Sequence, residues 1–233
     1  NFVCLMMIKK EEKDTTSCSK VLLKDVLNAT LRNKSFTNLI IMSVLWECTR
    51  YFSIGFMGIF KTKDLLLSVF VVQIINTVAN ILRIIVSKPF GRYSDRTSFA
   101  KGFELAVTIA MMSFFVSIFI TPSTWYLIII QTILHHVSLA GTNMNSYNIV
   151  YSYVDQSYFT QAMSIKNCIS GIFGFGASIL GGRILNFVQA NGNSFLGIHL
   201  YGQQLLSAIS FVFAVILLIY MKLVIEKQKV KIQ

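Results

Sequence analysis

The sequence predicts an all-α integral membrane protein, a bundle of six transmembrane helices, from three observations. Hydrophobic residues make up 54% of the 233-residue chain and charged residues only 13%, with a mean hydropathy of +0.62. A soluble domain carries about 25% charged residues, because its surface faces water. The chain also contains six long apolar windows, and most of its positive charges lie on one side of them. We therefore expect lipid to surround most of the polypeptide.

Each apolar window is long enough to cross a bilayer. A spanning helix needs roughly 20 mostly apolar residues, because its backbone polar groups must be satisfied within the helix across ~30 Å of hydrocarbon. We expect the six spans at Phe36–Phe60, Leu65–Val86, Gly102–Ile120, Trp125–Val154, Tyr158–Val188 and Tyr201–Ile225. Pro122 stands in the third connection, where a helix has to stop in any case.

The positive charges predict the orientation of this bundle. Residues 9–34 contain seven Lys and Arg, residues 88–101 contain four and residues 222–231 contain four, fifteen in all on one side. The opposite side receives only Lys61 and Lys63. Loops rich in Lys and Arg stay in the cytoplasm. We therefore expect a multi-pass protein of the cell membrane with both termini cytoplasmic.

The same features exclude other classes of protein. The net charge of +11 does not predict a nucleic-acid partner, because the basic residues lie between apolar runs and form no single basic stripe. The four cysteines show no CxxC and no metal-ligand spacing, and the chain has no HExxH or GxSxG motif. We expect no metal, no cofactor and no enzyme activity.

The basic connection after the second span contains a recognisable pattern. Gly91 permits close approach of the backbone, and Asp95 can cap a helix or pair with a neighbouring arginine. Gly91, Asp95 and Arg96 resemble the Gly-x-x-x-Asp-Arg signature of the major facilitator superfamily, which recurs between the second and third helices of each six-helix half. The resemblance implies a cytoplasmic gating motif at these three residues; an ordinary basic loop is the alternative.

A second resemblance covers the fourth and fifth spans. Residues 140–148, residues 166–176 and the pair Gly181-Gly182 are similar to a group of bacterial facilitator-superfamily proteins, mostly without an assigned substrate. The resemblance implies two pseudo-symmetric six-helix halves that bind cargo between them near the membrane midplane. This chain would supply the C-terminal half, and the N-terminal six-helix half of the same polypeptide would be its partner.

The resemblance also implies a division of the chain. We expect residues 1–8, an apolar stub, to be the end of a preceding membrane helix, and residues 9–35 to be a cytoplasmic linker between the halves. An amphipathic helix on the inner membrane surface is an equal alternative for that linker. Residues 36–225 would form the six-helix half, and residues 226–233 a cytoplasmic tail.

Charged residues inside a span are expensive and are functional candidates by default. Glu47 and Arg50 lie near the centre of the first span, three residues apart on neighbouring helix faces. We expect them in a central cavity with the aromatic residues Trp46 and Tyr51. There Arg50 would attract anionic or hydroxyl-rich cargo and Glu47 would bind a proton or cation. A structural ion pair is the alternative.

The second span carries a polar stripe at helical spacing, which must face protein or water. Its members are Gln73, Asn76, Asn80 and Arg83. Lining of the cavity and hydrogen bonding between helices are both open.

The fourth span adds Gln131 and His135 near mid-membrane. A histidine titrates near neutral pH, so His135 is either a proton carrier or a hydrogen-bonded structural residue.

The fifth span carries a ridge of small residues, which allows helices to approach closely. Its members are Gly171, Gly174, Ser178 and Gly182. It serves either tight packing or a sliding contact. Lys166 and Arg183 of this span are expected to reach the two membrane interfaces.

Together these patterns predict a secondary active transporter that moves a small solute by alternating access, coupled to protons. Efflux of a drug or metabolite and uptake of a sugar or organic anion remain open. The alternative from another class is a polytopic membrane receptor or scaffold that does not transport.

Overall fold

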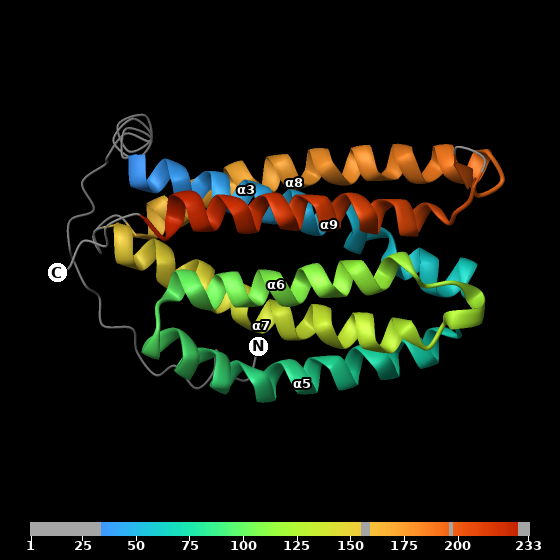
Figure 1. Cartoon of the computed structure of the whole chain (residues 1–233), viewed down its shortest axis with the longest axis horizontal. Coiled ribbons are helices and arrows are strands. Elements are labelled where there is room, and N and C mark those ends of the chain that lie inside the picture. The colour runs from blue at the N-terminus through green and yellow to red at the C-terminus, as the bar shows by residue number, and fades with distance from the viewer. Residues whose placement is uncertain (1–33, 155–158, 196–197, 228–233) are drawn as a thin grey trace, which may run out of the picture.

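The computed structural model describes residues 34–154, 159–195 and 198–227. This part of the chain forms long helices joined by short connections (Figure 1). The long helices are α3 (Lys34–Ser53), α5 (Val69–Arg96), α6 (Phe99–Ile118), α7 (Leu127–Tyr153), α8 (Phe159–Ala190) and α9 (Gly202–Tyr220). The predictions for residues 1–8 and for nearly all of the linker and tail lie outside the described residues.

Short elements complete the architecture. Beyond α3 the chain continues through η1 (Ile54–Phe56), α4 (Met57–Ile59) and η2 (Phe60–Asp64), and α9 continues into η5 (Met221–Ile225). The turn η3 (Pro122–Thr124) contains the proline that was expected to stop a helix. A two-stranded antiparallel ribbon, β1 (Ser194–Phe195) with β2 (Ile198–His199), connects α8 to α9.

Five helical stretches are long and apolar enough to cross a membrane. They are Lys34–Asp64, Val69–Arg96, Phe99–Ile118, Phe159–Ala190 and Gly202–Ile225. α7 is 27 residues long but is not among these five. Its apolar sequence is interrupted by Gln131, the two histidines and several asparagines. The helical architecture predicted from the sequence is confirmed, and it is compatible with a bundle inserted in a membrane.

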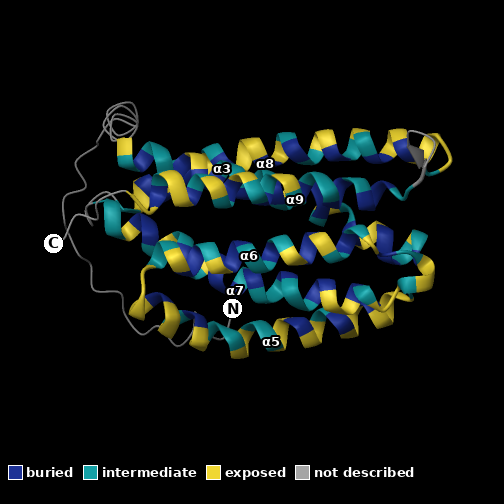
Figure 2. Cartoon of the chain, viewed as in Figure 1, coloured by how far each residue is buried: buried dark blue, intermediate teal, exposed yellow. Residues whose placement is uncertain are grey.

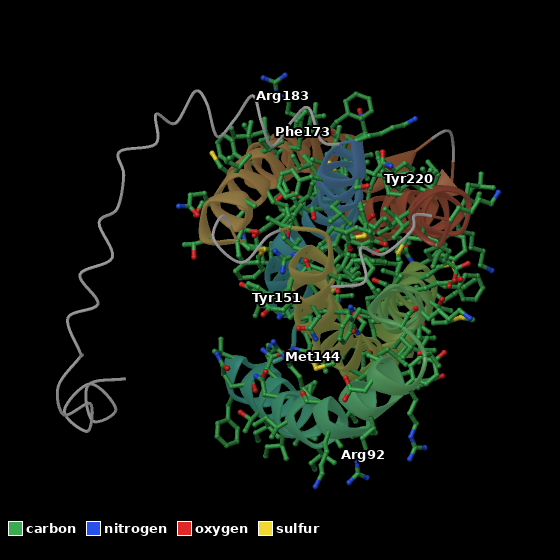
Figure 3. The ribbon with its side chains drawn as sticks, turned by 90° about the vertical axis from the view of Figure 1, so that its left-hand side faces the viewer. Arg92, Met144, Tyr151, Phe173, Arg183 and Tyr220 are labelled. Carbon is green, nitrogen blue, oxygen red and sulfur yellow. The ribbon has the colours of Figure 1, made fainter. Side chains whose placement is uncertain are left out.

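The helices pack in two layers. α3, α8 and α9 form one layer and α5, α6 and α7 the other, as the view along the helices shows (Figure 3). α3 packs on α8 and α9, α7 packs on α5 and α6, and α6 and α9 pack on each other across the layers. Arg92 and Arg183 point away from the bundle at its opposite outer edges (Figure 3).

The apolar core lies where α3, α6 and α9 meet. Leu39 and Met42 of α3, Phe103 and Phe114 of α6 and Leu217 of α9 are fully enclosed there. α5 and α8 instead show long exposed stretches on their outer faces (Figure 2). An exposed apolar helix face fits contact with lipid or with another membrane domain.

The second helix is longer than the sequence predicted. α5 continues through Pro89 to Arg96, so most of the expected basic connection is helix and the break comes at Thr97 and Ser98. Ser98, not Asp95, caps α6, because its hydroxyl accepts a hydrogen bond from the Lys101 amide at 3.2 Å. Of the two roles open to Asp95, capping of α6 is therefore taken by Ser98.

The first span is broken near its end. α3 stops at Ser53, and two residues with low helix propensity, Gly55 and Gly58, follow. Gln203 of α9 donates hydrogen bonds to the Ser53 carbonyl at 3.0 Å and to its hydroxyl at 2.8 Å. In a membrane a broken helix requires such a substitute partner, because no lipid group can take the freed carbonyl. The break turns the following residues toward α5 and α7.

Candidate functional site

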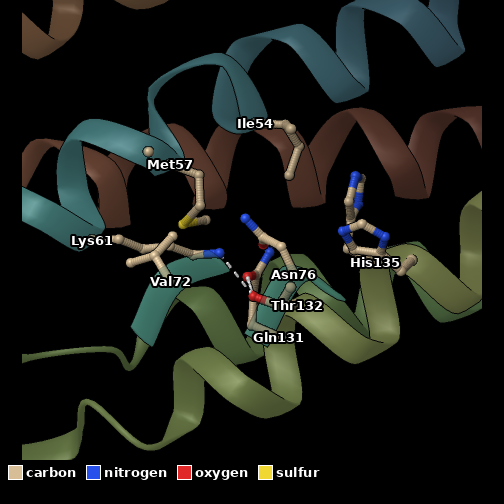
Figure 4. Close-up of a pocket in the computed structure, with 10 residues that line it drawn as sticks. Ile54, Met57, Lys61, Val72, Asn76, Gln131, Thr132 and His135 are labelled. Atoms are coloured by element: carbon tan, nitrogen blue, oxygen red, sulfur yellow. Dashed lines mark hydrogen bonds between the residues drawn. The ribbon is translucent and has the colours of Figure 1, made fainter. Parts of the chain in front are cut away.

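A cavity of about 210 Å³ lies beside the break in the first span (Figure 4). Its walls come from the segment after α3, from α5 and from α7. The lining residues are Ile54, Met57, Gly58, Lys61, Val72, Asn76, Gln131, Thr132, His135 and His136. Asn76 is the eighth residue of α5 and His135 the ninth of α7, which places them roughly 10–12 Å inside the bundle. Three of the predicted cavity residues, Asn76, Gln131 and His135, are thus brought together.

The most unexpected residue in this cavity is Lys61. The sequence predicted it as a loop charge outside the membrane, but its side chain is only 5% exposed and turns back into the bundle. Its Nζ donates a hydrogen bond to Thr132 Oγ1 at 2.9 Å (Figure 4). Lys61 sits in the π-helical turn η2, which follows the break. Such turns frequently mark functional sites.

Lys61 begins a chain of hydrogen bonds that leads into the bundle. Thr132 donates to Gln131 Oε1 at 3.3 Å, and Gln131 Nε2 donates to Ser113 of α6 at 3.3 Å. The Ser113 hydroxyl donates in turn to the Gln131 carbonyl at 3.1 Å. The Gln131 amide is therefore held in place by both its ends and can orient the threonine that contacts the lysine.

The two histidines of α7 have different environments. His136 Nδ1 forms a hydrogen bond with Asn80 Oδ1 of α5 at 3.1 Å. His135 is fully buried, and its Nδ1 has no hydrogen-bond partner within the part of the chain described. Lys61 and Arg83 act electrostatically on both rings. His135 thus contributes an unused polar atom to the wall of a cavity bordered by positive charge.

The predicted pair of the first span is formed. Arg50 donates to Glu47 at 2.7 Å, and its guanidinium lies 4.7 Å from the centre of the Tyr51 ring. Both charged side chains are about one quarter exposed, and the guanidinium Nε of Arg50 is buried with no partner among the described residues. Glu47 is the fourteenth residue of α3, roughly 20 Å from the start of that helix. The predicted ion pair is therefore half-buried, deep along the span.

A second buried lysine, on α8, lies near this pair. Lys166 of α8 is 4% exposed, donates to Ser146 of α7 at 2.8 Å and is near enough to Glu47 to interact with its charge. The sequence predicted that Lys166 would reach an interface; that prediction is wrong. Arg183, in contrast, is exposed and points out of the bundle.

Six of the nine predicted cavity residues do not line this cavity. Glu47, Arg50 and Tyr51 lie together on α3, and Asn80 contacts the lining residue His136. The other two are Trp46 and Gln73. Trp46 is in the apolar core, with its ring centre 6.0 Å from that of Phe103 in an edge-on contact, so its assignment to the cavity is wrong. One residue along a helix turns the side chain by 100°, and Glu47 occupies the polar face. Gln73 is exposed on α5 and does not line the cavity, although it continues the same stripe.

The residues of the expected gating motif lie on the last turns of α5. Asp95 and Arg96 are exposed, and neither forms an ion pair with another described residue. Gly91 faces Met144 of α7, whose sulfur would lie 3.7 Å from a Cβ at this position (Figure 3). The tightest contact at this end is made instead by Gly102, where an added Cβ would collide with Ser94 and Asn145.

The glycines of α8 pack only in part as the sequence predicted. A Cβ on Gly174 would lie 2.8 Å from the Tyr51 ring, so its role in close packing is confirmed. Gly181 makes the equivalent contact with the Phe52 carbonyl at 3.0 Å, whereas Gly182 is only in ordinary contact with Phe56. Gly171 faces open space and does not pack, so its assignment is wrong.

A polar cluster at the start of α9 was not predicted. Gln204 donates to the Ile118 and Ile120 carbonyls at 2.9 and 3.0 Å, and Ser207 donates to Ser117 at 2.8 Å. These bonds satisfy the end of α6. Two adjacent glutamines at the start of an apolar span were the available signal.

Neither a metal site nor a known relative identifies the chain. Among the described residues, no group of three or more His, Cys, Asp or Glu could hold a metal ion. No protein-family model, curated protein or solved structure matches the sequence.

Proposed function

We propose that this chain is the C-terminal six-helix half of a major-facilitator-type secondary transporter, which moves a small solute across the cell membrane by alternating access. The observation that carries the proposal is a row of polar and charged side chains inside the bundle. It runs from Lys61 past Asn76 and His135 to the Glu47–Arg50 pair and then to Lys166. Polar and charged groups at membrane depth must face protein or a path for solute.

The packing of the helices supports the proposed architecture. If α3 is exchanged with α7, α5 with α8 and α6 with α9, the principal packed pairs stay the same. α3 on α8 becomes α7 on α5, and α3 on α9 becomes α7 on α6. The exchange relates the first three long helices of the chain (α3, α5 and α6) to the last three (α7, α8 and α9). Because successive helices alternate in direction, equivalent helices run in opposite directions (Figure 1). An inverted repeat of this kind is frequent in transporters, with the binding site at the repeat interface.

The exposed part of α5 supports a second half. Gln73 and Asn80 are exposed on the flank of α5 that adjoins the cavity. Lipid cannot satisfy their amides, so another protein wall or water must do so. In the proposal the N-terminal half of the same polypeptide supplies that wall, and Asp95 and Arg96 of the gating motif pair across the interface.

The remaining parts of the proposal concern coupling and orientation. Glu47 would carry the coupling proton, because it is the carboxylate placed at mid-depth in the row of polar side chains. The end of the bundle that carries Lys34, Arg96 and Lys222 would be cytoplasmic, in accord with the positive-inside rule.

The test is transport by the full-length protein in proteoliposomes, with a panel of labelled solutes measured for uptake, efflux and counterflow. Accumulation or counterflow of at least one solute above that of empty liposomes is expected. Saturable binding of a solute without any counterflow would instead identify a receptor or scaffold.

A further inference from the structure

Lys61 is a buried cation that pairs with no carboxylate of the described residues. Its ammonium group has three donors, and the bond to Thr132 Oγ1 at 2.9 Å uses one of them. A buried charge costs far more than a buried polar group unless another charge compensates it. A hydroxyl supplies a dipole, not a charge. The charge of Lys61 is therefore left for a ligand in the cavity.

The surrounding charges do not neutralise it. Within the described residues, the ion pairs join Arg50 to Glu47 and Lys222 to Glu104, and neither includes Lys61 or Arg83. Asp64 is three residues from Lys61 in sequence, but the cation that acts on it is Lys63. The described lining of the cavity thus carries the positive charge of Lys61 and no carboxylate, and the nearest deep carboxylate of the first span, Glu47, is already paired with Arg50.

We propose that this cavity binds a small organic anion and that Lys61, through contact with the anionic group, determines this specificity. The inference rests on the proposed transport function, whose substrate class it names. Asn76 and Gln131 add amide groups, and the unpartnered Nδ1 of buried His135 can bond a ligand hydroxyl. A cavity of about 210 Å³ is below the usual size of drug-sized pockets, so the ligand is small.

The experiment measures equilibrium binding to the purified full-length protein, without transport. The probes are succinate and inorganic phosphate, each compared with a neutral counterpart, succinamide and trimethyl phosphate. At least one anion should bind, and its neutral counterpart should not. The anion that binds decides between a carboxylate and a phosphate ligand.

Variants assign the effect to one side chain. Lys61→Met should weaken anion binding roughly tenfold or more, because a charge-assisted hydrogen bond is lost. Lys61→Arg keeps the charge and should retain most of the affinity. If Lys61→Met does not fold, the binding measurement is made with Lys61→Arg instead. Lys63→Met is the matched control, because it removes an exposed positive charge two residues away and should leave binding within about twofold.

Three results would overturn the inference: no binding of either anion, equal binding of the neutral probes, or equal binding by the Lys61→Met and Lys63→Met proteins. Failure of the proposed function gives a different result. An anion that binds through Lys61 but shows no counterflow contradicts transport and leaves the binding site intact. Counterflow of a neutral or cationic solute that does not depend on Lys61 would support the proposed transport function and contradict the anion specificity.

Discussion

Two cations of the first span, Arg50 and Lys61, are both drawn into the bundle but differ in their partners. Arg50 lies on the regular part of α3, where Glu47 one turn earlier neutralises it at 2.7 Å. Lys61 lies beyond the break in that helix, where its partner is the hydroxyl of Thr132 at 2.9 Å. An ion pair one helical turn apart is set by sequence spacing alone. The lysine is placed by the fold, and its charge is not compensated by the residues that surround it.

The difference suggests that the two sites have different functions. A paired carboxylate can exchange its partner for a proton, whereas an unpaired ammonium can hold a ligand. The two sites lie along the first span, and the charges of Arg50 and Lys61 both act on His135. Coupling between a proton site and a solute site requires this kind of proximity. The following changes test this difference.

Replacement of the deep carboxylate should have the largest effect on function. In the full-length protein, Glu47→Gln should abolish accumulation driven by a pH gradient, because no proton can bind there, but should preserve counterflow, which needs no net coupling. The measurement is uptake into proteoliposomes with and without an imposed gradient. Glu104→Gln is the matched control, since Glu104 pairs with Lys222 at 3.4 Å near the end of the bundle. Undiminished gradient-driven uptake by Glu47→Gln would remove this residue from the coupling mechanism.

The wall behind the ion pair should be sensitive to added volume. Gly174→Ala places a methyl group 2.8 Å from the Tyr51 ring and should lower the free energy of unfolding by about 1–3 kcal/mol. Gly171→Ala on the same helix faces open space and should raise it by about 0.5–1 kcal/mol, because alanine has the higher helix propensity. Thermal unfolding in detergent measures both. Equal loss in the two variants would mean that α8 does not pack on α3 through Gly174.

Removal of the partner of Lys61 should have an effect that a second substitution reverses. Thr132→Val leaves the ammonium without its hydrogen bond and should cost about 1–3 kcal/mol. In the double variant with Lys61→Met, most of this loss should disappear, because the charge that needed the hydroxyl is gone. Unfolding midpoints of the two single variants and the double variant give the coupling. Simple additivity would show that the two side chains do not interact.

The regular features of the fold followed from local sequence pattern. Long apolar windows predicted the helices, and spacing of three residues predicted that Glu47 and Arg50 would meet. Spacing of three and four residues also placed Asn76 on one stripe of α5. These predictions need only the geometry of one helix, so no tertiary contact could alter them.

The features that the sequence did not reveal depend on contacts between helices. Lys61 follows the break after Ser53, which contains two glycines. The chain direction after this break depends on Gln203, 142 positions after Lys61, whose side chain donates to the freed Ser53 carbonyl. Trp46 was predicted to line the cavity but lies in the apolar core, because periodicity alone does not say which face of a helix lines a cavity. Gly181 rather than Gly182 packs for the same reason, since the contacting face is set by Phe52 of another helix.

The central claim is that the polar stripe of α5 faces water or solute while its apolar face does not. Maleimide labelling of single cysteines tests it directly in the full-length protein after replacement of its native cysteines. The positions are Asn76 and Asn80 on the stripe, with Val78 as the control at the same depth on the opposite flank of the helix. We expect rapid labelling of Asn76→Cys and Asn80→Cys by a membrane-impermeant maleimide, with Val78→Cys protected in lipid. Protection of both stripe positions, or labelling of all three alike, would contradict it.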